Sequence, residues 1–295
     1  LGSLMASELN NLGFYEPLLP VNHARIEQHH PLYYRRDDES LDDYARRSAQ
    51  ELEDKILEIG ADKVSAFIGE TMLSAMVGDV PPAPGYWKYV REVCDRHGIH
   101  LILDEVYCGL GRSGRSFCCE WDEARPDFVT VGKTLAAGYV PLSAVITTDA
   151  VANAIADGSQ GRIQHGHTHQ GHCLGVAAAL AVQKVVQTDE MLNRVEELGE
   201  RMRTSLRDGL GNHPYLRDIR GRGMLFSVEY NCPEKKEFGM RIAEMLRVDG
   251  GILLNAKWHR MSFVPPFILT DDEAERMTDA VVRAFHATAD GWTAC

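Results

Sequence analysis

The chain has 295 residues, of which 31 are lysine or arginine and 43 are aspartate or glutamate, so its formal charge is −12 at pH 7. A content of 44% hydrophobic and 25% charged residues is typical of a globular protein that can bury a large core. The acidic balance argues against nonspecific nucleic-acid binding, which depends on clustered lysine and arginine. The sequence contains no run of the roughly 20 apolar residues that a membrane-spanning helix needs. We therefore expect neither a nucleic-acid partner nor a membrane partner.

The seven cysteines are odd in number and lack the regular spacing of a disulfide framework. Cys118 and Cys119 are adjacent, and no pair follows the Cys-x-x-Cys pattern of thiolate zinc sites. We therefore expect reduced thiols in a cytoplasmic protein and no metal centre.

Hydrophobic spacing predicts alternating helices and strands along the chain. Apolar residues three and four positions apart, as in residues 45–59, indicate a helix with one buried face. Short apolar runs such as residues 99–103, which follow the helix-stopping Gly98, indicate strands. By these criteria we predict helices over residues 45–59, 86–97, 175–186, 191–206 and 271–285, and strands over residues 64–68, 99–103, 128–131, 143–148 and 224–230.

This order of elements indicates an α/β fold in two parts. Strands that alternate with helices in the first part predict a mainly parallel sheet flanked by helices. After about residue 172 the pattern changes to two consecutive helices, and residues 220–223 then introduce a strand. We therefore predict a large domain over residues 1–188 and a smaller C-terminal α+β domain over residues 189–295.

Three segments place polar groups at the predicted carboxyl ends of strands. Residues 104–114 begin with an Asp-Glu pair and continue into a glycine-rich loop, residues 126–133 end on Gly-Lys, and residues 138–142 form a turn before another apolar strand. Each segment alone is weak evidence, because a lysine after a strand is commonly solvated and an Asp-Glu pair is commonly an N-cap. Their shared position matters more, since functional groups of parallel sheets gather at the carboxyl ends of strands.

In this order and spacing the segments resemble the class III, pyridoxal-phosphate-dependent aminotransferases of the type I fold. The strongest stretch covers residues 85–142, and His-Gly-His-Thr-His-Gln-Gly-His at residues 165–172 is similar to the family's histidine-threonine-glycine signature. The similarity extends from Leu1 to the closing helix. It implies pyridoxal 5'-phosphate as cofactor.

The resemblance assigns roles to three residues around the cofactor ring. Lys133 would form the Schiff base with the cofactor aldehyde and later carry the proton between substrate and cofactor. Asp104 would pair with the pyridine nitrogen and keep it protonated, which makes the ring an electron sink. Val106, two residues further along, would face the same way and pack on the ring.

Two more cofactor-binding residues follow from the same resemblance. Thr168 would donate its hydroxyl to the cofactor phosphate from the neighbouring subunit, which implies a homodimer with shared active sites. Glu70 matches a strand-end glutamate on the substrate side of the cofactor. The family usually has proline after this glutamate, and this chain has Thr71.

Substrate choice is less well determined. Many relatives that bind an α-carboxylate have an arginine three residues before the Pro-Pro pair, where this chain has Ser262. The nearest arginine, Arg260, is therefore the candidate for binding a substrate carboxylate. Tyr107 also replaces a glutamine that several relatives carry near the cofactor hydroxyl. Both differences favour relatives that take ω-amino acids or simple amines over the ornithine type.

Some family features fall outside the sequence. The phosphate-binding glycine-serine turn and the ring-stacking aromatic residue belong to an N-terminal part that would precede Leu1, and the region before Pro265 is also short. We expect the complete polypeptide to be longer.

The predicted function is an aminotransferase that moves an amino group from an amine or ω-amino acid donor to a keto acid by a ping-pong mechanism. An aminomutase, racemase or decarboxylase would use the same lysine and aspartate, and a catalytically silent relative is a further alternative. A distant alternative is a metal-dependent hydrolase, because His165, His167 and His169 would share one face of a strand.

Overall fold

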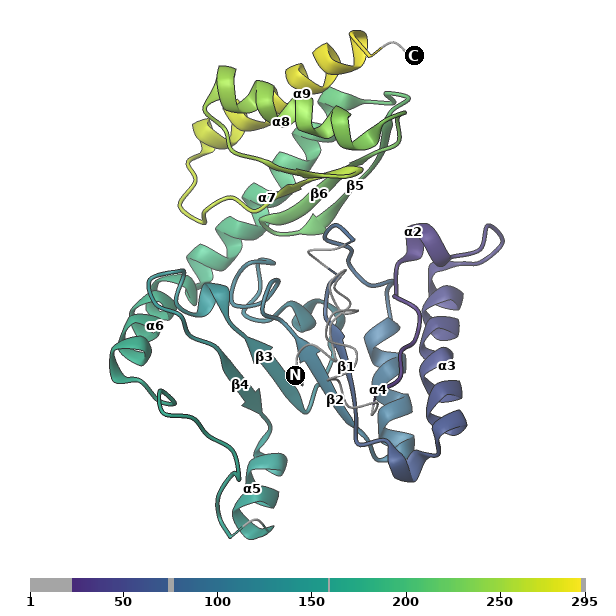
Figure 1. The fold of residues 1–295 in the computed structure, drawn as a ribbon, viewed down its shortest axis with the longest axis vertical. Helices are drawn as coiled ribbons and strands as arrows, with labels where there is room; N and C mark the ends of the chain where they lie inside the picture. Colours follow the sequence, from purple (N-terminus) through teal and green to yellow (C-terminus); the bar gives the residue numbers. More distant parts are fainter. Residues whose placement is uncertain (1–22, 74–76, 159, 293–295) are drawn as a thin grey trace.

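The computed structural model describes residues 23–73, 77–158 and 160–292. These residues form two four-stranded β-sheets, each with its own helices (Figure 1). The first sheet lies in the N-terminal half of the chain, and the second lies in the C-terminal part above it in the view of Figure 1.

The first sheet has the strand order β1-β2-β3-β4. Its strands are β1 (Ala66–Glu70), β2 (His100–Asp104), β3 (Phe128–Val131) and β4 (Ala144–Thr147). The first three are parallel and β4 is antiparallel to β3. Glu70 pairs in register with Asp104, and Asp104 pairs with Thr130, so three strands end at one edge of the sheet.

Two helices cover the sheet on the side of β1 and β2 (Figure 1). Helix α4 (Tyr86–His97) packs on β2, and α3 (Leu41–Ile59) packs on α4. The side chain of Ser40 accepts a hydrogen bond from the Asp43 amide at the start of α3, and Gly98 ends α4 in the left-handed conformation with φ 65°.

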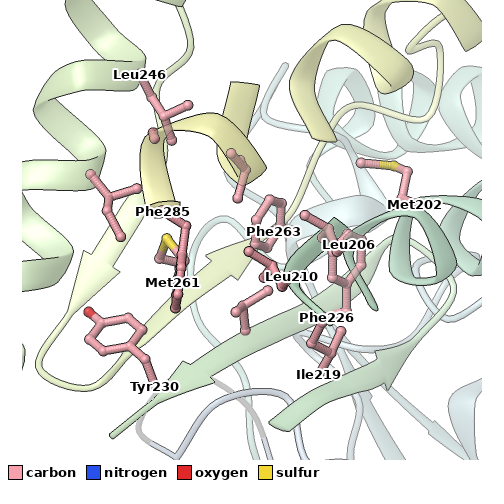
Figure 2. Close-up of a cluster of buried hydrophobic side chains, with 14 of the residues drawn as sticks. Met202, Leu206, Leu210, Ile219, Phe226, Tyr230, Leu246, Met261, Phe263 and Phe285 are labelled. Atoms are coloured by element: carbon pink, nitrogen blue, oxygen red, sulfur yellow. The ribbon is translucent and has the colours of Figure 1, made fainter. Parts of the chain in front are cut away.

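The second sheet is antiparallel, with the order β5-β6-β8-β7. Three helices pack on this sheet and share its apolar core. In the core the rings of Phe226 and Phe263, from two strands, stack with centroids 4.7 Å apart, and Phe285 of a helix packs nearby (Figure 2). The elements of this part are α7 (Asp189–Leu210), β5 (Leu216–Arg222), β6 (Leu225–Tyr230), α8 (Lys235–Gly250), β7 (Asn255–Lys257), β8 (Arg260–Phe263) and α9 (Asp271–Asp290).

Shorter elements connect these layers. They are the one-turn helix α2 (Pro31–Tyr34), the 3₁₀ turns Ala61–Lys63, Cys118–Asp122 and Lys133–Leu135, and the helices α5 (Asp149–Gly158) and α6 (Cys173–Val186). Among the described residues, no helix is both long and apolar enough to span a membrane. The cysteines of this described part, Cys94, Cys108, Cys118, Cys119, Cys173 and Cys232, all carry free thiols.

The two sheets are joined by arginines that extend from one part to the other. The guanidinium of Arg112, in the glycine-rich loop, donates to the carbonyls of Pro265 at 2.6 Å and Met224 at 3.2 Å. In the other direction, Arg222 of β5 forms a bidentate ion pair with Asp122, with N–O distances of 2.7 and 3.0 Å. The glycine-rich loop is therefore held against the second sheet.

The predicted α/β fold with a mainly parallel sheet is confirmed, and the five predicted helices and five predicted strands are present within a few residues. The interpretation of residues 220–223 was wrong, because Arg220 and Arg222 belong to strand β5 itself. Sequence analysis also missed α5, α8, β7 and β8, whose apolar patterns are short or mixed with charge. The domain boundary between residues 188 and 189, which falls just before α7, stays a prediction.

A close approach between α7 and the second sheet yields a stability prediction. A Cβ atom added at Gly199 would lie 2.0 Å from the carbonyl oxygen of Gly223, which also accepts a hydrogen bond from Arg203. Because the backbone must shift to admit it, Gly199→Ala should lower the free energy of unfolding by about 1–3 kcal/mol in urea titrations. The helical control Gly158→Ala, where a Cβ meets nothing within 4 Å, should not be destabilised. Equal stability of the two variants would contradict the packing argument.

Candidate active site

The carboxylate of Asp104 stands at the end of β2. Its Oδ1 accepts the backbone N–H of Val106 at 2.9 Å, which ties the carboxylate to the turn that follows the strand. The side chain of Val106 packs toward Gly132, since a Cβ on that glycine would lie 3.4 Å from Val106 Cγ1. The turn after β2 therefore lies beside the segment that carries Lys133.

Lys133 comes two residues after the end of β3 and opens a 3₁₀ turn. Its φ of 39° is in the left-handed region, which is uncommon for residues other than glycine and is often found at functional sites. The side chain is exposed, and its Nζ lies 5.0 Å from the centroid of the Tyr107 ring. The amine is therefore presented at the same edge of the sheet as Asp104.

Tyr107 connects the strand ends to charges from other elements. Burial raises the pKa of its hydroxyl to about 12, and the negative charges of Asp79 and Glu70 act in the same direction. The positive charges of Arg112 and Arg260 oppose this rise. These four charged residues therefore lie close enough to Tyr107 to act on its hydroxyl, and Asp79 and Arg112 were not identified from the sequence.

Glu70 is the last residue of β1 and lies next to Asp104 in the register of the sheet. Its backbone carbonyl is hydrogen bonded to Nε2 of the buried His29 at 3.2 Å. Parallel pairing of three strands thus brings Glu70, Asp104 and the segment before Lys133 to one edge, as the sequence led us to expect. The roles of these residues stay predictions.

A buried polar cluster joins the loop after β1 to the second sheet. Asp79 is 1% exposed, and its Oδ2 accepts the hydroxyl of Ser227 at 2.5 Å. The Oγ atoms of Ser227 and Ser262 lie 3.1 Å apart. Burial raises the pKa of Asp79 to about 6, against the opposing effects of the Ser227 hydrogen bond and of the charges of Arg260 and Arg220. This loop therefore carries a carboxylate whose charge is costly to bury.

Arg260 is 3% exposed and lies on β8 under the same loop. A Cβ on Gly78 would lie 2.4 Å from its Cδ, so the loop backbone rests directly on the arginine stem. Burial lowers the pKa of the guanidinium, while the charge of Asp79 opposes that change. Because side chains alternate along a strand, Arg260 and Ser262 share one face of β8. The loop backbone at Gly78 covers Arg260 on this face, so its guanidinium is not accessible to solvent.

Thr168 is exposed in the connection between α5 and α6. This connection runs beside β4, at the opposite edge of the first sheet from α3 (Figure 1). The histidines around it lie in a loop and a turn, so the strand that would align His165, His167 and His169 is absent from this described segment. Within the residues that the structure describes, no group of three His, Cys, Asp or Glu side chains is arranged to hold a metal ion.

The buried carboxyl of Asp79 predicts a pH dependence of stability. Because the native pKa, about 6, exceeds the unfolded value of 3.8, the proton stabilises the fold below about pH 4 and this contribution is lost as the pH rises through 6. Asp79→Asn cannot titrate, so its stability relative to the wild type should rise by about 2 kcal/mol between pH 4 and pH 7. Urea unfolding at the two pH values measures this difference, and parallel pH profiles would contradict it.

Known proteins match this chain over most of its length. The sequence pattern of the family described as aminotransferase class-III matches residues 18–285. An aminotransferase from Gibberella zeae is 39% identical over 213 residues, which are 72% of this chain and 42% of that protein. Diaminobutyrate-2-oxoglutarate transaminase from Halomonas elongata is 31% identical over 307 residues, which are 99% of this chain and 64% of that protein.

The fold agrees with a solved structure as well. The omega transaminase from Pseudomonas jessenii in complex with PMP has a TM-score of 0.83 and 29% sequence identity, over 90% of this chain and 60% of that one. The chain thus spans about 42% to 64% of the length of these three proteins. Since the family pattern covers most of the chain and the solved structure has the same fold, this chain belongs to the class III aminotransferase family.

Proposed function

We propose that the protein is a pyridoxal-phosphate-dependent aminotransferase that moves an amino group from an amine or ω-amino acid to a keto acid. The observation that carries the proposal is the position of Asp104 at the end of β2 beside the β3 segment that ends in Gly132 and Lys133. A carboxylate and an amine at this edge of the sheet are the two groups that the family's chemistry requires.

The residues present fit this cofactor. Asp104 offers a carboxylate for a pyridine nitrogen, Lys133 offers an exposed amine for an aldehyde, and Val106 offers an aliphatic surface for a ring. Beside Asp104, the hydroxyl of Thr130 is buried and has no hydrogen-bond partner among the described residues, which leaves a polar atom for a ligand to satisfy. The donor set therefore suits a flat ring with a basic nitrogen.

Lys133 and Asp104 would each hold or move a proton, and Val106 would keep Asp104 in position. The bound cofactor supplies an electron sink for the substrate carbon. Lys133 would hold the cofactor covalently through Nζ, and once released it would move a proton to and from the substrate carbon, which requires a partly neutral amine. Asp104 would hold the proton on the ring nitrogen, and the Val106 N–H would keep the carboxylate aimed.

Two substitutions test these roles in the full-length protein. Lys133→Ala should abolish the visible absorption band that borohydride removes from the wild type, because no amine remains to bind the cofactor covalently. Asp104→Asn should still bind cofactor but lose most of the rate, since an amide cannot hold the ring nitrogen protonated. Absorption spectra and single-turnover kinetics measure both effects.

Lys88→Ala is the matched control, because this lysine is exposed on α4 and its charge acts on Asp42 in α3. It should keep the band and the rate. Detection of amino-acid product from an added keto acid separates an aminotransferase from an aminomutase, racemase or decarboxylase. Full activity of Lys133→Ala would refute the proposal, and the absence of any band in the wild type would favour a silent relative.

We also propose that the donor is an ω-amino acid or a simple amine rather than an ornithine-like compound. Ser262 offers only a hydroxyl where many relatives have an arginine, and that hydroxyl already lies within 3.1 Å of Ser227. Arg260 would then bind the substrate carboxylate from the same face of β8, after the loop that carries Gly78 and Asp79 moves away from it.

A homodimer in the cytoplasm completes the proposal. Exposed apolar side chains gather on β4 and α6 and in the loop before β4, which supports contact with a second copy. These residues are Tyr139, Val145, Ile146, Leu174, Val176, Leu180 and Val185. Thr168 lies in the connection that precedes α6, so it would be carried into the partner's site to bind the cofactor phosphate. The free thiols support a reducing compartment.

Mixing two inactive variants tests the shared site. If Lys133 and Thr168 of one site come from different subunits, refolding Lys133→Ala with Thr168→Val at equal amounts gives heterodimers with one intact site each. Because about half of the dimers are then mixed, activity should return to about a quarter of the wild-type value. Either variant refolded alone is the control. No recovery in a verified mixed dimer would mean that both residues act within one subunit.

A further inference from the structure

Thr71 uses two hydrogen-bond donors that the proline usual at this position could not supply. The residue is fully buried, at 0% exposed. Its backbone N–H donates to the carbonyl of Asp104 at 3.3 Å, and its hydroxyl donates to Oε1 of Glu105 at 3.0 Å. Proline has neither an N–H nor a hydroxyl. This chain therefore ties the end of β1 to the Asp104-Glu105 pair through contacts that follow from its own departure from the family pattern.

Glu105 is a buried carboxylate that depends on these donors. It is 1% exposed, and besides the Thr71 hydroxyl it accepts the backbone N–H groups of Cys118 at 2.6 Å and Cys119 at 2.7 Å. Burial raises the pKa of Glu105, and the hydrogen bonds oppose that rise. Removing one donor would leave a buried charged oxygen short of a partner, which costs more than an ordinary hydrogen bond is worth.

The backbone of Glu105 in turn determines how Asp104 is presented. Its N–H donates to the carbonyl of Thr130 at 3.0 Å, and the next amide, that of Val106, holds Oδ1 of Asp104 at 2.9 Å. The side-chain anchors of Glu105 and this N–H belong to one residue, so together they hold the backbone between Asp104 and Val106 in place. The direction of the Asp104 carboxylate therefore depends on whether Glu105 keeps its partners.

Thr71 is itself held from the opposite side. The indole N–H of Trp87 donates to its carbonyl at 2.9 Å, and His29 contacts the carbonyl of Glu70 at 3.2 Å. The rings of His29 and Trp87 pack with centroids 5.4 Å apart. These contacts hold the Thr71 backbone in place, and Thr71 in turn holds the end of β2 through its bonds to Asp104 and Glu105.

We propose that Thr71 is a positioning residue that acts through Glu105 to aim the carboxylate of Asp104 at the cofactor's ring nitrogen. The inference rests on the proposed function, because it assumes that Asp104 binds this ring. It assigns the hydroxyl of Thr71 to cofactor affinity and to the protonation of the bound cofactor, and not to contact with the substrate.

The first test measures cofactor affinity of the full-length protein after the cofactor has been removed. Titration with pyridoxal phosphate, followed by tryptophan fluorescence, should give a Kd about 10-fold higher for Thr71→Val than for the wild type. Thr71→Ser keeps the hydroxyl and should stay within about twofold of the wild type. The matched control Thr278→Val removes another buried hydroxyl, which donates to the carbonyls of Ala274 and Glu275 within α9, and its Kd should not change.

A second measurement distinguishes positioning from general loss of stability. The pH midpoint of the visible absorption band of bound cofactor should shift in Thr71→Val and not in Thr71→Ser or Thr278→Val, because the ring protonation depends on Asp104. In the Asp104→Asn background, Thr71→Val should have no further effect on cofactor affinity. Additive effects of the two substitutions, or a lower melting temperature with an unchanged pH midpoint, would overturn the proposal.

Failure of the inference is distinguishable from failure of the proposed function. If the wild type binds pyridoxal phosphate and Thr71→Val binds it equally well, the aminotransferase proposal stands and the role of Thr71 is wrong. If the wild type forms no absorption band at saturating cofactor, the proposed function fails first, and the positioning role fails with it.

Discussion

Parallel pairing of β1, β2 and β3 is the constraint on which the candidate site depends. In a parallel sheet all three strands end at one edge, and the register places Glu70, Asp104 and Thr130 side by side there. Each strand end then leads into a short segment with its own polar group. A shift of one residue in any strand would turn these side chains to the other face of the sheet. The relative positions of the polar groups at the site therefore depend on this register.

Buried charge is the second feature that shapes the site. Arg112 is enclosed between the glycine-rich loop and the second sheet, where burial lowers its pKa to about 10, and Glu105 and Asp79 are buried nearby. Each group is paired with hydrogen-bond donors or acceptors from a different element. A buried charged group without partners raises the free energy of the fold. The loops are therefore stable only in the positions where these groups keep their partners. This links the second sheet to the geometry of the first.

The sequence placed Asp104, Val106 and Lys133 at or just after strand ends, and the structure has them there. Their roles stay predictions. The positions could be predicted because the pattern at a strand end involves only neighbouring residues. Asp79, Arg112 and Ser227 were missed because each reaches the site through a contact between residues far apart in the sequence. Arg260 was selected because it is the arginine nearest to Ser262, and only the structure reveals that the loop at Gly78 encloses it. Thr168 lies in a connection whose partner belongs to another chain in our proposal.

The sequence by itself determined the class of fold, the alternation of helices and strands, and the identity of the residues that end the parallel strands. Hydrophobic periodicity and turn residues are sufficient for this, since they act over a few neighbouring positions. Only the tertiary structure decided which strands pair, how the second sheet covers the glycine-rich loop, and that Thr71 bonds to Glu105. These contacts depend on strand register and on burial. Both are properties of the whole packed chain, and no short segment encodes them.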